Sequence, residues 1–343
     1  MLSINDNKPH SFDEISEKML VYLDQNILSN LRDGKSARGE LAGLMKSLAE
    51  KGAVFVYSTT HVDECRSSNF PETFVDVLEG IPVHFMETEN ASDEQSILSL
   101  GRAQEMLMEP EDTSHYAKRL MEDCLRVWHF ASGWLNNIEA VELKNEIVSE
   151  INKFWESLRQ EVNSGLLDDR SRRKVRFVSH LAQDNMVDDV KNWPVDQLAK
   201  ELIEEIAELK NRLPENYAQL DEVPDEKAVS FMFSCLSCKS KEEVEERYPK
   251  GFWKTIENRN AGDLTGLAFL LFMSGLVRDK RVYTKSNNRR IQYFRAQFRD
   301  GMHIENAARC AVFITTDKGA TRLSRSIYAY AGVKTKVVHL KID

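Results

Sequence analysis

"MLVYLDQNILSNL", residues 19–31, changes its pattern at a single residue, Asp24. Residues 19–23 form an apolar run with a β-branched and an aromatic member, which predicts a buried β-strand. Asp24 ends this run, and residues 25–31 then have the pattern of a short helix. A buried strand that ends on a carboxylate puts that charge at the mouth of a sheet, where the charge needs a partner or a functional role.

The composition indicates a soluble globular protein. With 343 residues, 42% of them hydrophobic, the chain can form one large domain or two moderate ones with a sizeable core. The first ten residues lack the basic and apolar regions of a signal peptide, and the apolar run at 266–277 is too short to cross a bilayer. The five cysteines are odd in number and scattered. We therefore expect a cytoplasmic protein with no membrane partner.

The net charge of −9 means that the molecule as a whole repels polyanions. A nucleic acid would have to bind at local basic patches, helped by bridging cations.

Two regions of the chain have an α/β pattern, and the long middle is helical. Helices separate the predicted strands, which implies parallel pairing and right-handed crossovers. The predicted strands are residues 19–24, 53–58, 311–315 and 335–340, with 81–87 as a further candidate. Helical periodicity fills much of the middle, at 116–134, 147–162 and 198–213. We expect one sheet from both ends of the chain (residues 1–90 and 283–343), interrupted by an all-helical insertion (91–282).

Four acids occupy related places in this pattern. Asp24 follows the first strand, and Glu64 lies one to two turns into the helix after the second strand. Asp300 is predicted to begin a helix, and Asp317 follows the strand at 311–315. Because the carboxyl ends of parallel strands meet at one sheet edge, we expect these acids to converge in one anionic pocket.

Clustered carboxylates repel one another unless a cation neutralises them, and hard oxygen ligands suit Mg²⁺ or Mn²⁺. One or two such ions can activate water for phosphodiester hydrolysis. Taken singly, Asp24, Asp300 and Asp317 could each cap a helix, and Glu64 could be a surface residue. The four together, in this order, favour a site.

The segments "YLDQNIL", "YSTTHVDE", "FRDGMHIENAARC" and "FITTDKG" resemble, in order, the acidic motifs of PIN-domain nucleases. The resemblance covers residues 18–87 and 283–343. It implies a three-layer α/β/α sandwich with a parallel central sheet and a Mg²⁺- or Mn²⁺-dependent ribonuclease activity. Asp24, Glu64, Asp300 and Asp317 would be its catalytic and metal-binding residues. Asn26, Ser58 and Thr315 match supporting positions of the motifs. The long insertion departs from the family, whose members join the two halves by a short helical stretch.

Two further residues near the acids are candidates for supporting roles. His303 lies three positions after Asp300 and could meet a phosphate or a metal-bound water, or simply pack. Lys318 follows Asp317 and could contact the scissile phosphate or remain exposed. Cys235 and Cys238 have a metal-ligand spacing, but no second Cys or His pair lies near them in sequence, which favours packing over zinc.

The segment at 277–299 is basic and leads directly into Asp300. It carries many arginines and lysines with interleaved aromatic residues, a pattern typical of single-stranded nucleic-acid binding. A solvated basic helix is the alternative. The RNA-binding candidates in this segment are Lys285, Arg289, Arg290, Arg295 and Arg299.

These observations predict a metal-dependent endoribonuclease that hydrolyses RNA. Family analogy alone adds a toxin-like or defence effector role with a regulatory protein partner. Two alternatives remain: a structure-specific DNA nuclease of the related flap type, and a non-catalytic binding protein of the same fold. The sequence leaves the oligomeric state open.

Overall fold

The computed structural model describes residues 19–32, 38–66, 73–74, 77, 83–86, 97–98, 140–164, 169–192, 222–236, 238–255, 259–260, 262–273 and 287–341. The described residues divide into two compact units. The first contains those within 1–109, 212–279 and 297–343, and the second those within 110–211 and 280–296. The first unit thus includes part of the segment predicted as an insertion. The periodic stretches at 116–134 and 198–213 lie outside the described residues.

The first unit is built on one sheet with the strand order β4-β3-β2-β1-β5-β6. Its strands are β1 (Met19–Leu23), β2 (Ala53–Tyr57), β3 (Val83–Met86), β4 (Ile97–Leu98), β5 (Val312–Thr315) and β6 (Lys336–His339). All neighbours pair in parallel except β3 and the short β4, which are antiparallel. Strand β1 pairs with β2 on one side and with β5 on the other. The predicted α/β class and the joining of the two chain ends in one sheet are confirmed.

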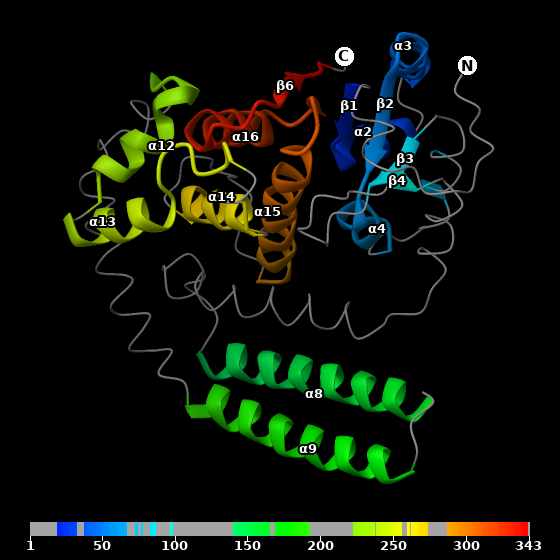
Figure 1. Ribbon diagram of the computed structural model, residues 1–343, viewed down its shortest axis with the longest axis vertical. Helices are drawn as coiled ribbons and strands as arrows, with labels where there is room; N and C mark the ends of the chain where they lie inside the picture. Colours follow the sequence, from blue (N-terminus) through cyan, green and yellow to red (C-terminus); the bar gives the residue numbers. More distant parts are fainter. Residues whose placement is uncertain are drawn as a thin grey trace. The chain divides into compact units, whose positions relative to one another are not determined.

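Helices separate the strands along the chain, and further helices follow in the middle segment (Figure 1). In the first half of the chain they are α2 (Gln25–Arg32), α3 (Arg38–Glu50), α4 (Thr59–Arg66), α8 (Ala140–Ser164) and α9 (Asp169–Asn192). In the second half they are α12 (Asp225–Ser234), α13 (Cys238–Arg247), α14 (Asp263–Met273), α15 (Asn287–Ala307) and α16 (Lys318–Ala331). Helix α16 ends on Gly332, whose φ of 80° is the left-handed conformation that glycine adopts most easily.

One prediction about the helices is wrong: Asp300 does not begin a helix. Helix α15 starts at Asn287 and continues through Asp300 and Gly301 without a break. Gly301 lies against α14, where an added Cβ would be 3.4 Å from Cβ of Ala268. The Asp-Gly pair is therefore a place of close helix packing, and tertiary contact keeps the helix intact across a local turn signal.

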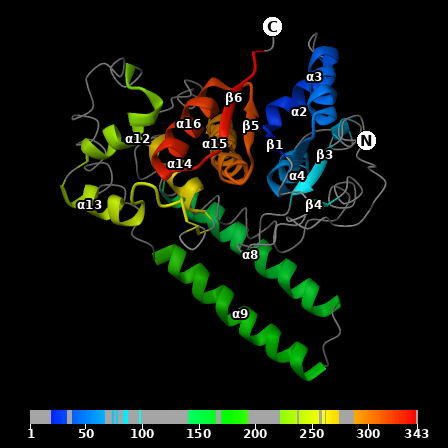
Figure 2. The ribbon, with the colours of Figure 1, turned by 45° about the horizontal axis from the view of Figure 1, so that its top comes forward.

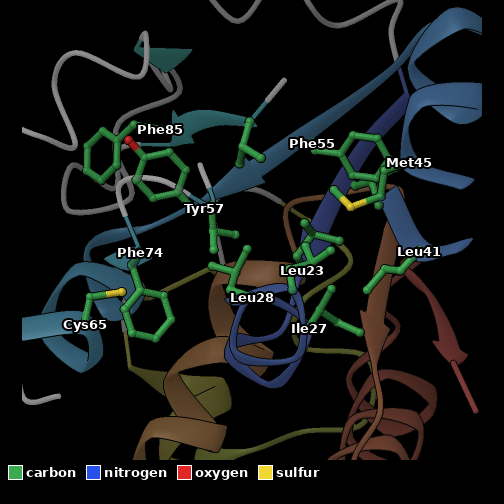
Figure 3. Close-up of a cluster of buried hydrophobic side chains, with 14 of the residues drawn as sticks. Leu23, Ile27, Leu28, Leu41, Met45, Phe55, Tyr57, Cys65, Phe74 and Phe85 are labelled. Atoms are coloured by element: carbon green, nitrogen blue, oxygen red, sulfur yellow. The ribbon is translucent and has the colours of Figure 1, made fainter. Parts of the chain in front are cut away.

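Alternate side chains of the central strands fill a hydrophobic core with α2 and α3. Figure 3 shows Leu23 of β1 facing Ile27 and Leu28 of α2, and Met45 of α3 against Phe55 of β2. All five side chains are buried. Because the strand period is two, the residues between these positions, including Tyr22, belong to the opposite face of the sheet.

On that opposite face lie the C-terminal helices. Figure 2 shows α14, α15 and α16 beside β5 and β6. The Tyr328 hydroxyl of α16 donates to the Ile304 carbonyl of α15 at 2.5 Å. The backbone N–H groups of Gly251 and Trp253 donate to the carbonyls of Tyr330 and Ala331, which ties residues before α14 to the end of α16.

The second unit contains a helical hairpin formed by α8 and α9, which lie side by side in Figure 1. Arg159 Nη1 donates to Gln183 Oε1 at 2.6 Å, and the Trp155 indole N–H points to Met186 Sδ at 3.4 Å. Later residues of α8 contact earlier residues of α9, so the two helices are antiparallel. No helix within the described ranges is long and apolar enough to cross a membrane.

Candidate functional site

Asp24 lies at the carboxyl end of the central strand β1 and is 2% exposed. Its backbone N–H donates to the Ile314 carbonyl of β5, which fixes the residue at the sheet edge. Its Oδ2 accepts from Thr315 Oγ1 at 2.6 Å and from Asn26 Nδ2 at 3.0 Å. Both of these hydrogen bonds reach the same oxygen, so they orient the carboxylate through Oδ2.

Burial raises the pKa of the Asp24 carboxyl. His303 and the hydrogen bond from Thr315 act in the opposite direction, whereas the charge of Glu64 raises this pKa further. The ionised carboxylate therefore costs free energy in this position and favours a cationic partner.

Thr315 joins Asp24 to Asp317. Its Oγ1 donates to Asp24 and accepts from the backbone N–H of Asp317 at 3.0 Å. Asp317 precedes α16, and its Oδ1 accepts from the Ala320 N–H at 2.9 Å. Asp317 is thus a helix cap, as the alternative interpretation held. Lys318, the first residue of α16, is exposed.

Glu64 of α4 meets two residues of α15. Its Oε2 lies 3.3 Å from Nε2 of His303, and its Oε1 lies 3.9 Å from Nη1 of Arg299. Its side chain is only 15% exposed, so Glu64 is not a solvated helix-surface residue. His303 is 1% exposed and connects Glu64 to the interior. Asp300, one turn before His303 on α15, is partly exposed.

Behind His303 lies a buried polar chain that the sequence did not reveal. The Tyr22 hydroxyl of β1 is 2.8 Å from His303 Nδ1 and 2.7 Å from Ser58 Oγ. Asn306 of α15 donates through Nδ2 to Ser58 Oγ and to Thr60 Oγ1, both at 3.0 Å. Burial raises the pKa of Tyr22 well above its ordinary value, so its hydroxyl keeps its proton.

One assignment of hydrogens satisfies every group in this chain. Asn306 donates to Ser58, Ser58 donates to Tyr22, and Tyr22 donates to Nδ1 of His303. His303 then carries its hydrogen on Nε2 and donates to Glu64. The chain therefore fixes the ring orientation of His303, which in turn orients the carboxylate of Glu64.

His61 packs beside this chain and is held neutral. Its Nε2–H donates to the Leu23 carbonyl at 2.6 Å, and its Nδ1 accepts from the Ser58 N–H at 3.0 Å. Burial and the neighbouring His303 lower the pKa of His61 well below its ordinary value. His61 thus ties α4 to the end of β1, the strand that carries Asp24.

Tyr22, His61 and Asn306 were missed at the sequence level because each looked ordinary in its segment. Tyr22 counted as an apolar strand residue, although a buried tyrosine needs a partner for its hydroxyl. Asn306 lies three positions after His303, so the shared helix face was a signal that could have been used.

The donor set was tested for its fit to a divalent ion. The described part of the chain holds no group of three or more His, Cys, Asp or Glu side chains placed to ligate one metal. Mg²⁺, however, keeps several waters and is commonly held by one or two carboxylates plus substrate phosphate. Asp24, whose charge is destabilised by burial and which is oriented through Oδ2, is compatible with such a site, and the charge of Glu64 raises its pKa further.

The predicted RNA-binding residues are placed only in part. Lys285 lies outside the described residues, and Arg289, Arg290 and Arg295 lie within α15. Arg299 reaches Glu64, as described above. Cys235 is buried at the end of α12, and Cys238 begins α13.

Comparison with models of protein families, with curated proteins and with solved structures found no match for this chain. The interpretation of the site therefore depends on its residues and their geometry.

Proposed function

We propose that the protein is a metal-dependent endoribonuclease that hydrolyses RNA at the edge where β1 and β5 end. The proposal includes a PIN-like three-layer arrangement of the sheet and its helices, interrupted by a helical insertion. The observation that carries it is Asp24: a buried carboxylate at the end of a central parallel strand, oriented by Thr315 and Asn26 through one oxygen. Burying an ionised carboxylate without a cation costs free energy.

Asp24 would hold Mg²⁺ or Mn²⁺, with Glu64, Asp300 and Asp317 as the further acids of the site. When bound, such an ion supplies an activated water and neutralises charge on the phosphate. The protein residues have separate tasks. Thr315 and Asn26 keep Asp24 in one orientation, and His303 does the same for Glu64. Lys318, exposed at the start of α16, is available to a phosphate group.

Tyr22 and Ser58 act through His303 and do not meet the substrate in this proposal, because both are fully buried. They are positioning residues. The proposed site thus has an outer set of acids and an inner, buried hydrogen-bond chain that holds Glu64 in place.

Cleavage of labelled nucleic acids tests the proposal. Single-stranded RNA, single-stranded DNA, duplex DNA and flapped DNA are incubated with Mg²⁺, Mn²⁺ or chelator. Cleavage of RNA that requires metal and is lost in Asp24→Asn supports the proposal. Preferential cutting of branched or flapped DNA would instead establish the structure-specific DNA nuclease. An absence of cleavage on all substrates, with metal bound, would favour the non-catalytic protein.

A further inference from the structure

Helix α9 carries an exposed apolar cluster on the side that faces away from α8. Phe177, Val178 and Leu181 are 71%, 61% and 53% exposed, and they make up three of the four large hydrophobic side chains that the described residues expose. The contacts to α8 come from other positions of α9, among them Gln183 and Met186. The hairpin therefore leaves this face of α9 without a cover from its own partner helix.

Charged residues flank the cluster in a symmetric order. Lys174 precedes Phe177 by three positions, and Asp184 follows Leu181 by three. Both charged side chains are exposed. Steps of three and four residues keep all of these positions on one helix face. The same charge pattern continues for four more residues on each side: Arg170 lies four positions before Lys174, and Asp188 lies four positions after Asp184.

When two copies of this helix face run in opposite directions, each basic residue lies opposite an acidic one and each apolar residue lies opposite an apolar one. We propose that the outward face of α9 is a dimerisation surface that binds α9 of a second copy of this chain, antiparallel, about a two-fold axis. Phe177 then meets the partner's Leu181, and Lys174 meets the partner's Asp184. Two-fold symmetry repeats each contact, so the basic half of each helix lies on the acidic half of the other.

Other occupants fit this face less well. A parallel copy would set Lys174 against the same lysine, and like charges disfavour that register. An RNA strand or an anionic lipid surface would gain from Lys174 but would be repelled by Asp184 and Asp188 on the same face. The charge pattern therefore favours a second copy.

The contact is small. From Arg170 to Asp188 the stripe is about 27 Å long at 1.5 Å per residue. Interfaces of this size are usually transient, so we expect a dimer in the micromolar concentration range whose stability falls with added salt.

Sedimentation velocity on the full chain, over a series of protein concentrations, tests the proposal with charge reversals. Lys174→Glu and Asp184→Lys should each weaken the dimer at least about tenfold, because each change makes two repulsive contacts by symmetry. A one-to-one mixture of the two variants should recover a heterodimer, and the double variant should recover a homodimer. Asp189→Lys, an equal charge change at an exposed position beside the stripe, should leave dimerisation unchanged.

Circular dichroism of each variant confirms that the helices are retained. A parent protein that stays monomeric at about 100 μM would overturn the proposal. So would a dimer that none of these variants affects, or single variants whose dimer is regained neither on mixing nor in the double variant. If the parent is monomeric and Lys174→Glu instead weakens RNA binding, the basic half of α9 is a nucleic-acid surface. This inference does not depend on the proposed nuclease activity.

Discussion

At the scale of single residues, the buried carboxylate of Asp24 has two effects: its charge costs stability, and the same charge would attract a cation. Its burial raises its pKa, so the ionised form of the carboxyl is held in the native state at a cost in free energy. The same charge is what would attract a divalent ion. A residue selected only for stability would be expected to lack that charge, and this conflict is typical of functional sites.

We expect Asp24→Asn to lower metal-dependent RNA cleavage at least about 100-fold, because it removes a ligand charge while keeping the side-chain shape. In chelator the variant should melt at a higher temperature than the parent, since the cost of the buried charge is gone. Added Mg²⁺ should raise the melting temperature of the parent more than that of the variant. Asp189→Asn, which removes the same charge from an exposed position, is the matched control. Equal cleavage by variant and parent would refute the assignment.

Tyr22 and Ser58 provide a test of the buried hydrogen-bond chain. Tyr22→Phe leaves Nδ1 of His303 and Oγ of Ser58 without their shared partner, and should lower the free energy of unfolding by about 1–3 kcal/mol. Ser58→Ala should have a similar cost. The double variant should cost less than the sum of the two single variants, because they break the same bond. Chemical denaturation measures all three, and strict additivity would show that the two hydroxyls are not coupled.

His61 makes a prediction about pH. Its pKa is lowered in the native state and is about 6.5 in the unfolded chain. Between these two values the unfolded state binds more protons than the native state, so stability falls as the pH drops below about 6.5. Above that pH the contribution is constant. His61→Gln should reduce the slope of melting temperature against pH between 6.5 and 5, whereas the exposed His180→Gln should not. An unchanged slope in His61→Gln would assign the acid sensitivity to other groups.

At the scale of elements, much of the sheet followed from the sequence. The apolar runs of β1, β2 and β5 each end next to a polar residue, and the strands of the structure end at these same places.

The functional site could be predicted only in part from the sequence. Tyr22 and His303 are 281 positions apart, and no local pattern states that a strand tyrosine will meet a helix histidine. The prediction that Asp300 begins a helix was wrong because a non-local contact, the packing of Gly301 on α14, accompanies an unbroken helix at this Asp-Gly pair.

Helix α14 depends on another buried acid of α15, Glu305. Its two carboxylate oxygens accept from the backbone N–H groups of Gly262 and Thr265 and from the Thr265 hydroxyl. The N–H groups at the start of a helix have no partner within the helix, so Glu305 satisfies donors that the helix itself cannot pair. It joins α15 to α14 at the place where Gly301 also brings them together.

Glu305→Ala should therefore lower the free energy of unfolding by about 2 kcal/mol or more, since several donors lose their acceptor at once. Glu305→Gln, which keeps one acceptor oxygen, should cost less. Glu246→Ala removes an exposed glutamate of α13 and should change stability little. Denaturant titrations of the three variants give the comparison. Equal losses in the Ala and Gln variants would mean that charge, and not hydrogen-bond number, determines the effect.

At the scale of the whole molecule, the net charge of −9 opposes the binding of RNA. Any affinity must come from a local concentration of positive charge that is strong enough to displace counterions. The segment that ends in Arg299 has this composition, and Arg299 reaches Glu64 of the proposed site. A strand held along α15 would therefore arrive at the acids from the side of the arginines.

We expect the double variant Arg289→Ala with Arg290→Ala to weaken the binding of single-stranded RNA and to flatten its salt dependence. Each lost phosphate contact lowers the slope of log affinity against log salt by roughly 0.7. Fluorescence anisotropy at several salt concentrations, in Ca²⁺ to prevent cleavage, measures this slope. Lys46→Ala with Lys51→Ala removes the same charge from exposed positions in and after α3, and should leave the slope unchanged. If both double variants keep the parent slope, the RNA does not follow α15, and the α8–α9 hairpin becomes the better candidate for holding it.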